Sequence, residues 1–329
     1  MATETAEADR PKTGARRVYA PVLNAIEGLT EAQFAYLMLA PVFLLMGVMA
    51  FWPLVRTFEM SLHADAPAMA APVGEYIGFE NYVDVLTGER TASLVRPIWS
   101  AERPLASALP VTIVFTAGVV IVETLLGTIM ALILNEEFEG RRWMRMLFIL
   151  PWAVPIVIQG MVFFLMFNDS VGFAGQMLTD AGVFGANPLS TPENAIWVVM
   201  LADIWKQTPF VALLVLAGLQ SIDRNLYNVA RVTGATRWER FTTVTFPLVL
   251  PTLLVAMLFR SLGAMKIYGT IVPVAGCNTV PSLSCVVVSA FNNRVYGTST
   301  TVAIVMAGII GVLMMLYIVP YYKSGAGEI

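Results

Sequence analysis

Long apolar stretches alternate with polar segments along the 329-residue chain. A helix that crosses a membrane needs about 20 mostly apolar residues at about 1.5 Å per residue. Several of the apolar stretches contain proline or glycine, which membrane helices tolerate where neighbouring helices satisfy the freed backbone groups. The pattern therefore predicts six transmembrane spans, at about 34–55, 109–134, 145–167, 195–219, 248–272 and 301–322.

Composition supports the same class of protein and narrows its chemistry. Hydrophobic residues make up 57% of the chain and charged residues 13%, against about 25% charged residues in soluble domains. The single histidine, His63, argues against a histidine-based metal site. The phosphate-binding pattern G-x-x-x-x-G-K-[ST] is absent from the sequence. We therefore expect an all-α polytopic membrane protein with no bound metal or cofactor and no nucleic-acid partner.

Lysine and arginine in the loops predict the orientation, because cytoplasmic loops carry an excess of them. A cytoplasmic N-terminus gives a tail at 1–33, a transmembrane domain at 34–322 and a cytoplasmic C-terminal tail at 323–329. The inner segments then hold most of the loop cations, namely Arg10, Lys12, Arg16, Arg17, Arg141, Arg142, Arg145, Arg224, Arg231, Arg237, Arg240 and Lys323. The outer segments hold fewer, namely Arg56, Arg90, Arg96, Arg103 and Arg294.

Both cysteines fall in one predicted outer segment. Cys277 and Cys285 lie within 273–300, and they are the only cysteines of the chain. A disulfide persists on the oxidising side of a membrane, so this pair is a disulfide candidate. Two unpaired thiols are the alternative, and neither reading implies redox catalysis.

The predicted inner segment 221–247 has the pattern of a short helix, a turn and a second helix. Asp223 is a suitable N-cap, apolar residues then recur at helical spacing, and Gly234 suits the left-handed conformation that ends a helix. This arrangement exposes Arg231 and Arg237, which favours a docking surface for a cytoplasmic partner. The alternative is an interfacial connector whose arginines only follow the loop charge rule.

Five charged residues fall inside the predicted spans. Charges are costly in hydrocarbon, so each is expected to face the helix bundle or a wet cavity. Asp203 and Lys206 are three residues apart on one helix face, which predicts that they pair. The full set is Glu123, Asp203, Lys206, Arg260 and Lys266.

The stretch "LYNVARVTGATRWERFTTVTFPLVLPTLL" resembles the cytoplasmic EAA loop of binding-protein-dependent ABC importers. Ala230, Gly234 and Pro247 occupy expected positions of that motif, as does Phe246. Asn228 stands where the family has glutamate, and Thr233 stands where it usually has aspartate. The segments "FENYVDVL", "LFILPWAVPIVIQGMVFFLMFND" and "DIWKQTPFVALLVLAGLQSI" are similar to carbohydrate permeases of the maltose and glycerol-phosphate type.

This resemblance implies the fold of a type I ABC importer permease and a role as the transmembrane subunit of an ATP-driven sugar importer that works by alternating access. It implies a second homologous permease, two ATP-binding subunits that use ATP and Mg, and an extracellular solute-binding protein. The chain itself would be non-catalytic and would lie, surrounded by membrane lipid, in a prokaryotic cell membrane. The residues implied in ATPase docking are Asn228, Ala230, Arg231, Gly234, Ala235 and Arg237.

A sugar pathway needs hydrogen-bonding groups and aromatic faces. Candidates near the predicted spans and their outer ends are Trp152, Gln159, Lys206, Lys266, Tyr268 and Asn292. For each residue alone, structural packing or interfacial anchoring is the alternative.

Two other functions remain open from the residues. An ion-coupled secondary transporter would work without an ATPase and would use Glu123, Asp203 or Lys206 as coupling groups. A membrane scaffold would carry out no transport at all.

Overall fold

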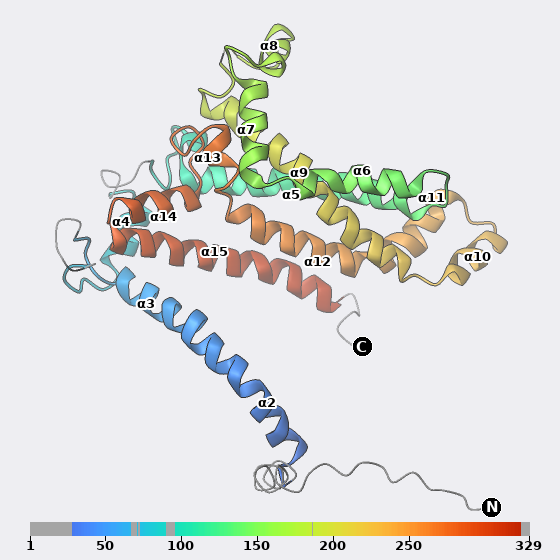
Figure 1. Cartoon of the computed structure of the whole chain (residues 1–329), viewed down its shortest axis with the longest axis horizontal. Coiled ribbons are helices and arrows are strands. Elements are labelled where there is room, and N and C mark those ends of the chain that lie inside the picture. The colour runs from blue at the N-terminus through green and yellow to red at the C-terminus, as the bar shows by residue number, and fades with distance from the viewer. Residues whose placement is uncertain (1–27, 67–70, 72, 90–95, 186, 324–329) are drawn as a thin grey trace, which may run out of the picture. The chain divides into compact units, whose positions relative to one another are not determined.

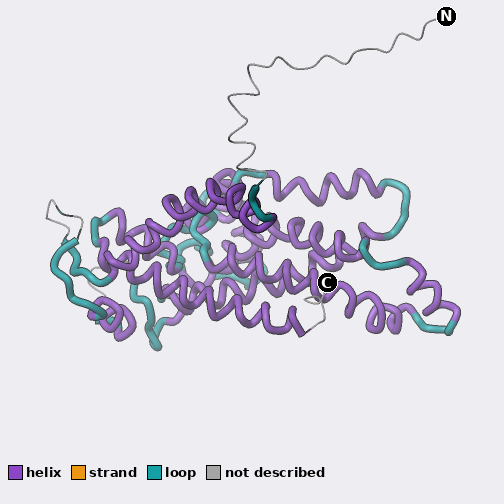
Figure 2. Tube along the Cα trace, turned by 90° about the horizontal axis from the view of Figure 1, so that it is seen from below, coloured by secondary structure: helices purple, strands orange, loops and turns teal. Residues whose placement is uncertain are grey.

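The computed structural model describes residues 28–66, 71, 73–89, 96–185 and 187–323. Within these ranges the regular structure is helical, and strand pairing is limited to one isolated bridge between His63 and Tyr76 (Figure 2). Most of the predicted N-terminal tail, the C-terminal tail after Lys323 and the predicted outer Arg90 lie outside the described residues. The predicted all-α class is confirmed.

The chain divides into two units, and the first extends from Met1 to Thr57. Its helix α2 (Glu31–Met46) continues through a π-helical turn, η1 (Gly47–Phe51), into α3 (Trp52–Ser61). The start is fixed by a capping box in which Thr30 Oγ1 accepts a hydrogen bond from Gln33 N and Gln33 Oε1 accepts one from Thr30 N. The apolar helix therefore begins before the predicted span 34–55 and ends after it.

The second unit, Phe58–Ile329, is organised around three long helices that contact one another. These helices are α5 (Ala108–Asn135), α9 (Pro192–Gln220) and α12 (Phe246–Met265). Figure 1 shows them side by side, with α15 (Tyr296–Lys323) along α12. Their facing surfaces bury the main apolar cores of the unit.

Close approach between α5 and α9 depends on a small residue. A Cβ atom at Gly127 of α5 would lie 2.8 Å from Cγ1 of Val211 on α9. Small residues allow membrane helices to pack backbone against backbone, where van der Waals contact replaces the hydrophobic driving force. Gly127 therefore sets the distance between the two helices that form the centre of this unit.

The third predicted span is broken rather than continuous. It consists of α6 (Arg141–Ala153) and α7 (Ile156–Phe167), which meet at an angle of 91°. Pro155 lies at the break, has no N–H to donate and disfavours helical geometry in the preceding residue. The predicted span at 145–167 thus coincides with this bent pair of helices, and the apolar pattern gave no indication of the angle between them.

The fifth span also differs from the prediction of 248–272. Its helix starts earlier, because α11 (Arg237–Arg240) and the π turn η4 (Phe241–Thr245) run into α12, and it ends at Met265. The prediction placed Lys266 inside this span, but Lys266 is the C-cap that follows the helix. In total, the described residues contain five single helices long and apolar enough to cross a membrane, or six when α6 and α7 count as one span.

Shorter helices complete the two ends of the second unit. Figure 1 shows α10 and α11 at one end of the bundle and α4, α13 and α14 at the other. The bounds of the remaining elements are α4 (Glu80–Thr87), η3 (Pro104–Ala106), α8 (Phe173–Asp180), α10 (Arg224–Val232), α13 (Ile271–Val274) and α14 (Leu283–Asn292).

Candidate functional site

Helix α10 has a defined start and a defined stop. The Asp223 carboxylate accepts a hydrogen bond from Asn225 N at 2.9 Å. At the other end Gly234 has φ of +84°, its N–H donates to the carbonyl of Arg231 at 3.1 Å, and Ala235 N–H donates to the carbonyl of Ala230 at 2.9 Å. These two bonds form a Schellman motif, which confirms the predicted left-handed glycine at the helix stop.

A second capping box follows the turn. Thr236 Oγ1 accepts from Glu239 N at 3.3 Å, and the Glu239 carboxylate accepts from Thr236 N at 2.7 Å. Trp238 stacks on Phe241 with ring centroids 5.6 Å apart. The turn between α10 and α11 is therefore fixed by local bonds on both sides, so α10 is presented in one orientation.

Three of the acidic groups around this turn are engaged by other groups, whereas Glu136, which lines the same cavity, is exposed. Arg224 donates to Glu137 at 2.9 Å, and this hydrogen bond together with the positive charge of Arg224 lowers the pKa of the Glu137 carboxyl. Asp223 and Glu239 serve as caps.

Arg231, Arg237 and Arg240 have no acidic partner among the residues that the structure describes. The turn is thus left with an excess of positive charge.

These three arginines line a cavity of about 1260 Å³ together with Asn228 and Arg141. The cavity lies between α10, α11 and the adjoining ends of α5, α6 and α9. We call this lining the basic groove. Arg141 is held in place by a hydrogen bond from its Nε to the carbonyl of Leu134 at 2.6 Å.

Helix α10 also exposes an apolar ridge. Leu226, Val229 and Val232 follow one another at intervals of three residues, and Val232 is 89% exposed. Contiguous exposed apolar side chains rimmed by polar groups mark interaction surfaces. The basic groove and this ridge together form a surface suited to an acidic and partly apolar partner.

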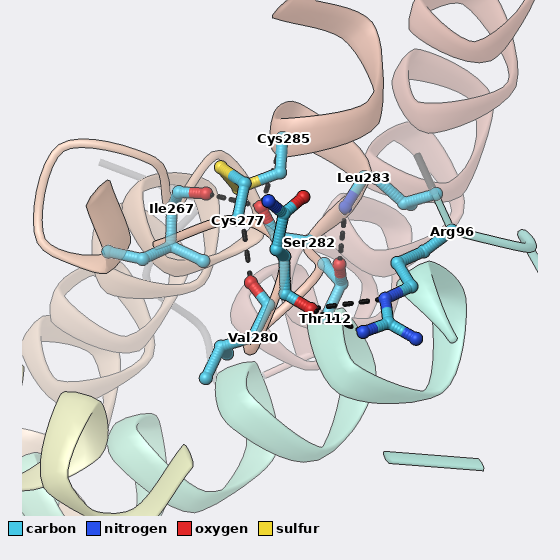
Figure 3. The surroundings of a disulfide bond; sticks show 9 residues. Arg96, Thr112, Ile267, Cys277, Val280, Ser282, Leu283 and Cys285 are labelled. Atoms are coloured by element: carbon cyan, nitrogen blue, oxygen red, sulfur yellow. Dashed lines mark hydrogen bonds between the residues drawn. A yellow bond between two sulfur atoms is a disulfide. The ribbon is translucent and has the colours of Figure 1, made fainter. Parts of the chain in front are cut away.

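At the opposite end of the bundle the structure joins Cys277 and Cys285 in a disulfide (Figure 3). Arg96 donates from Nε and Nη2 to the carbonyl of Asn278 at 3.0 and 2.8 Å. The Leu283 N–H donates to Thr112 Oγ1 on α5 at 2.9 Å. The disulfide loop is therefore bonded both to α5 and to Arg96 in the segment that precedes α5.

Three of the predicted intraspan charges form one buried network. Arg260 of α12 donates from Nη2 to Glu123 of α5 at 2.9 Å and to Asp203 of α9 at 2.7 Å. Its Nε makes a second contact with the Glu123 carboxylate, so that pair is bidentate. Glu123 is completely buried. The cation satisfies two acids from two other helices in a site where an unpaired charge would be costly.

The predicted pairing of Asp203 with Lys206 is wrong. Asp203 faces α12 and pairs with Arg260, whereas Lys206 donates from Nζ to the carbonyls of Trp152, at 3.0 Å, and Val154. Both acceptors belong to the break between α6 and α7. The Asp203 carboxylate is already bound by the Arg260 guanidinium, and the break leaves carbonyls without helix partners, which the Lys206 ammonium binds.

The predicted pathway residues lie on several elements. Gln159 is fully buried, and its Nε2 donates to the carbonyl of Ala202 on α9 at 2.5 Å. Trp152 is exposed and stacks on Phe210 with centroids 6.3 Å apart. Lys266 is exposed after α12, Tyr268 is half-buried in the same loop, and Asn292 is exposed at the end of α14. A role of these residues in substrate passage stays a prediction.

Sequence reasoning identified the buried charges but not their partners. Glu123 and Arg260 are 137 residues apart, and Asp203 and Arg260 are 57 apart. No local periodicity connects residues at such separations. The only available signal is the balance of two acids and one arginine, since buried charges need partners of opposite sign.

Comparison with known proteins is consistent with these features. Residues 123–322 match the family described as "Binding-protein-dependent transport system inner membrane component". This range contains the broken span, every residue that lines the basic groove, and all three members of the buried network.

Characterised relatives extend the match over most of the chain. The chain is 35% identical over 298 residues to the trehalose/maltose transport system permease protein MalF of Thermococcus litoralis, covering 90% of this chain and 94% of that protein. It is 27% identical over 301 residues to the trehalose transport system permease protein SugA of Mycobacterium tuberculosis, covering 91% and 92%. It is 32% identical to the sulfoquinovosyl glycerol transport system permease protein SmoG of Agrobacterium fabrum, covering 73% of each.

A solved structure shares the fold. A chain of a bacterial alginate ABC transporter, in complex with its alginate pentasaccharide-bound periplasmic protein, superposes with a TM-score of 0.66 at 20% identity. The superposition covers 92% of this chain and 96% of that chain, so the expected fold of an ABC importer permease is confirmed. From the family match and the relative that is 35% identical over nine-tenths of the chain, this protein belongs to the family of binding-protein-dependent transport system inner membrane components.

Proposed function

We propose that this chain is the permease subunit of an ATP-driven sugar importer and that it forms half of the translocation pathway. The observation that carries the substrate class is the 35% identity, over 90% of the chain, to a permease protein of a trehalose/maltose transport system. Two further relatives are permease proteins for trehalose and for sulfoquinovosyl glycerol, which also contain sugar units. A small glycoside is therefore the proposed cargo.

In this proposal, α10 docks the chain onto an ATP-binding subunit. The support is the fixed orientation of α10 between two capped ends, its exposed ridge of Leu226, Val229 and Val232, and the adjoining basic groove. Asn228 supplies no negative charge where the resembling loops have glutamate. We therefore expect the ATPase cleft to have an apolar floor and an acidic rim that meets Arg231 and Arg237.

The complete importer would contain a second, homologous permease, two ATP-binding subunits and an extracellular solute-binding protein. ATP and Mg would act at the partner subunits, and this chain would catalyse no reaction. The N- and C-termini and the basic groove would lie on the cytoplasmic side, and the disulfide loop would lie outside, in the cell membrane of a prokaryote. Closure of the ATPases, transmitted through α10, would drive alternating access.

The test is reconstitution. The chain is co-expressed with its candidate permease, ATPase and binding-protein partners, purified in mild detergent and placed in proteoliposomes. We expect ATP-dependent uptake of labelled trehalose or maltose that requires the binding protein, and no uptake of a labelled amino acid used as control. Uptake driven by an ion gradient in the absence of any ATPase would instead establish a secondary transporter.

The docking surface has a separate test. In the double variant R231E/R237E the charges facing the proposed acidic rim are reversed, so the ATPase should co-purify poorly. Wild-type association should weaken as salt rises, because salt screens exposed charges. The matched control is Arg103→Glu, an exposed arginine in the predicted outer segment. Unchanged co-purification of the double variant would refute the basic groove as the docking surface.

A further inference from the structure

One turn of α9 makes polar contacts with α6, α7 and α12, and the α12 contact extends to α5. Asp203 accepts a hydrogen bond from Arg260 of α12, and Arg260 also donates to Glu123 of α5. Ala202, the preceding residue, accepts a hydrogen bond from Gln159 of α7, and Lys206, three residues later, donates to two carbonyls at the α6–α7 break. We call residues 202–206 the α9 hub.

The break that Lys206 contacts needs a cation for a physical reason. The last carbonyls of a helix have no partner within the helix and carry the negative end of its dipole. At the end of α6, Pro155 offers no N–H to continue the ladder. The Lys206 ammonium supplies the missing donors to Trp152 O and Val154 O and places a positive charge at the negative helix end.

Helix α7 is fixed on its other side by close packing. A Cβ atom at Gly160 would lie 2.2 Å from Cγ of Pro273 on α13, so only glycine allows this approach. The neighbouring Gln159 is the residue that bonds to the α9 hub. Helix α7 is thus held between α9 and α13, while Lys206 of the same α9 turn binds the end of α6.

We propose that Lys206 is a positioning residue that sets the bend of the broken span and fastens it to the charged core of α5, α9 and α12. Arg260 anchors the hub within the core, and Lys206 extends that anchorage to the break. The core and the broken span then move as one body when the permease changes conformation. Lys206 touches backbone carbonyls, so this role requires no contact with the substrate.

The bend can be measured directly as a distance across the break. Nitroxide labels are attached at Met146→Cys on α6 and Leu165→Cys on α7, two exposed positions on either side of it. The native cysteines of the described chain are bonded to each other and do not compete for label. Double electron–electron resonance spectroscopy on the full-length labelled chain in lipid nanodiscs should give one narrow peak in the distribution of distances between the two labels.

Three substitutions of Lys206 remove its positive charge and its hydrogen-bond donors in steps. Lys206→Arg keeps a cation and several donors and should retain the narrow peak. Lys206→Gln keeps a hydrogen-bond donor without the charge and should broaden the peak. Lys206→Met removes both and should replace the single peak by a broad spread of distances. The matched control is Lys266→Met, which removes an exposed lysine outside the hub and should leave the peak unchanged.

The outcomes separate positioning from general stability. A Lys206→Met protein that unfolds at lower temperature but retains the narrow peak overturns the proposal. If Lys206→Met does not accumulate, the comparison of Lys206→Gln with Lys206→Arg decides, and identical peaks in those two variants overturn it as well. The readout needs neither an ATPase nor a sugar, so its result is independent of the proposed import function.

Discussion

The α10–α11 turn and the α9 hub both concentrate charged residues, but they use charge in opposite ways. In the turn, Arg231, Arg237 and Arg240 remain without acidic partners among the described residues and face an open groove. At the hub, Asp203 is buried and binds Arg260 of α12, whose guanidinium is buried between two carboxylates. Unpaired surface charge is suited to recognising a partner, whereas buried paired charge fixes the arrangement of the chain's own helices.

The comparison predicts that the largest effect on folding comes from the buried side. Arg260→Met leaves Glu123 and Asp203 buried without a cation, and removal of one member of such a pair costs about 3–5 kcal/mol. We expect a strong fall in the thermal unfolding midpoint of the purified chain. The triple variant E123Q/D203N/R260M removes the charges together and should recover part of the loss. A triple variant less stable than Arg260→Met would contradict this account.

The next effect concerns the packing that brings the hub helices together. Gly127→Val forces side-chain atoms into Val211 of α9, and overpacking of this kind costs about 1–3 kcal/mol. Thermal unfolding in detergent measures the loss. Gly308→Val on α15 is the matched control, because a Cβ atom there meets nothing within 4 Å. Equal losses in the two variants would show that the α5–α9 contact is not the cause.

A smaller effect on stability is expected in the turn, with a larger consequence for coupling. Gly234→Leu places a side chain at φ of +84°, where the left-handed conformation costs about 1–2 kcal/mol. The chain should still insert, but transport per ATP hydrolysed by the assembled importer should fall. Gly182→Leu, at φ of +74° with equally empty surroundings, is the control and should transport normally. Full coupling in Gly234→Leu would separate α10 from the docking role.

The smallest effect belongs to the cap of α10. Asp223→Ala removes the bond to Asn225 N, a change that costs about 1 kcal/mol at helix starts. Faster hydrogen exchange of the α10 amides should report it. Asp223→Asn keeps an oxygen acceptor and should exchange as the wild type does. A change that spread to the amides of α9 would mean that the turn and the hub are not independent.

Local features of the fold were readable from the sequence. The stop at Gly234 depends on residues within one turn, and each span is a contiguous apolar run. The ends of the spans were less accessible, because the fifth helix stops at Met265 although apolar residues continue to Val272 and beyond. Short apolar runs occur in spans and also in short helices outside them, such as α13.

The partners of the buried charges were not readable. Lys206 and Asp203 share a helix face, so local spacing favoured their pairing, but tertiary contacts gave each a different partner. The 91° angle between α6 and α7 was equally hidden. A proline indicates where a helix is interrupted, whereas the angle depends on what holds the two halves, here a lysine 52 residues away from Val154.

The disulfide at the other end of the bundle has a practical consequence for biochemical work. Its cysteines are separated by eight positions. A disulfide that closes a loop of about 15 residues stabilises a fold by about 3 kcal/mol, because it lowers the entropy of the unfolded chain, and a shorter loop contributes less. Reduction of this disulfide should leave the helices assembled, while the loop that contains Asn278 loses its fixed conformation. Preparations stored with a thiol reductant would then look well folded by circular dichroism. In the proposed importer they would bind the solute-binding protein differently, so samples should be compared with and without reductant.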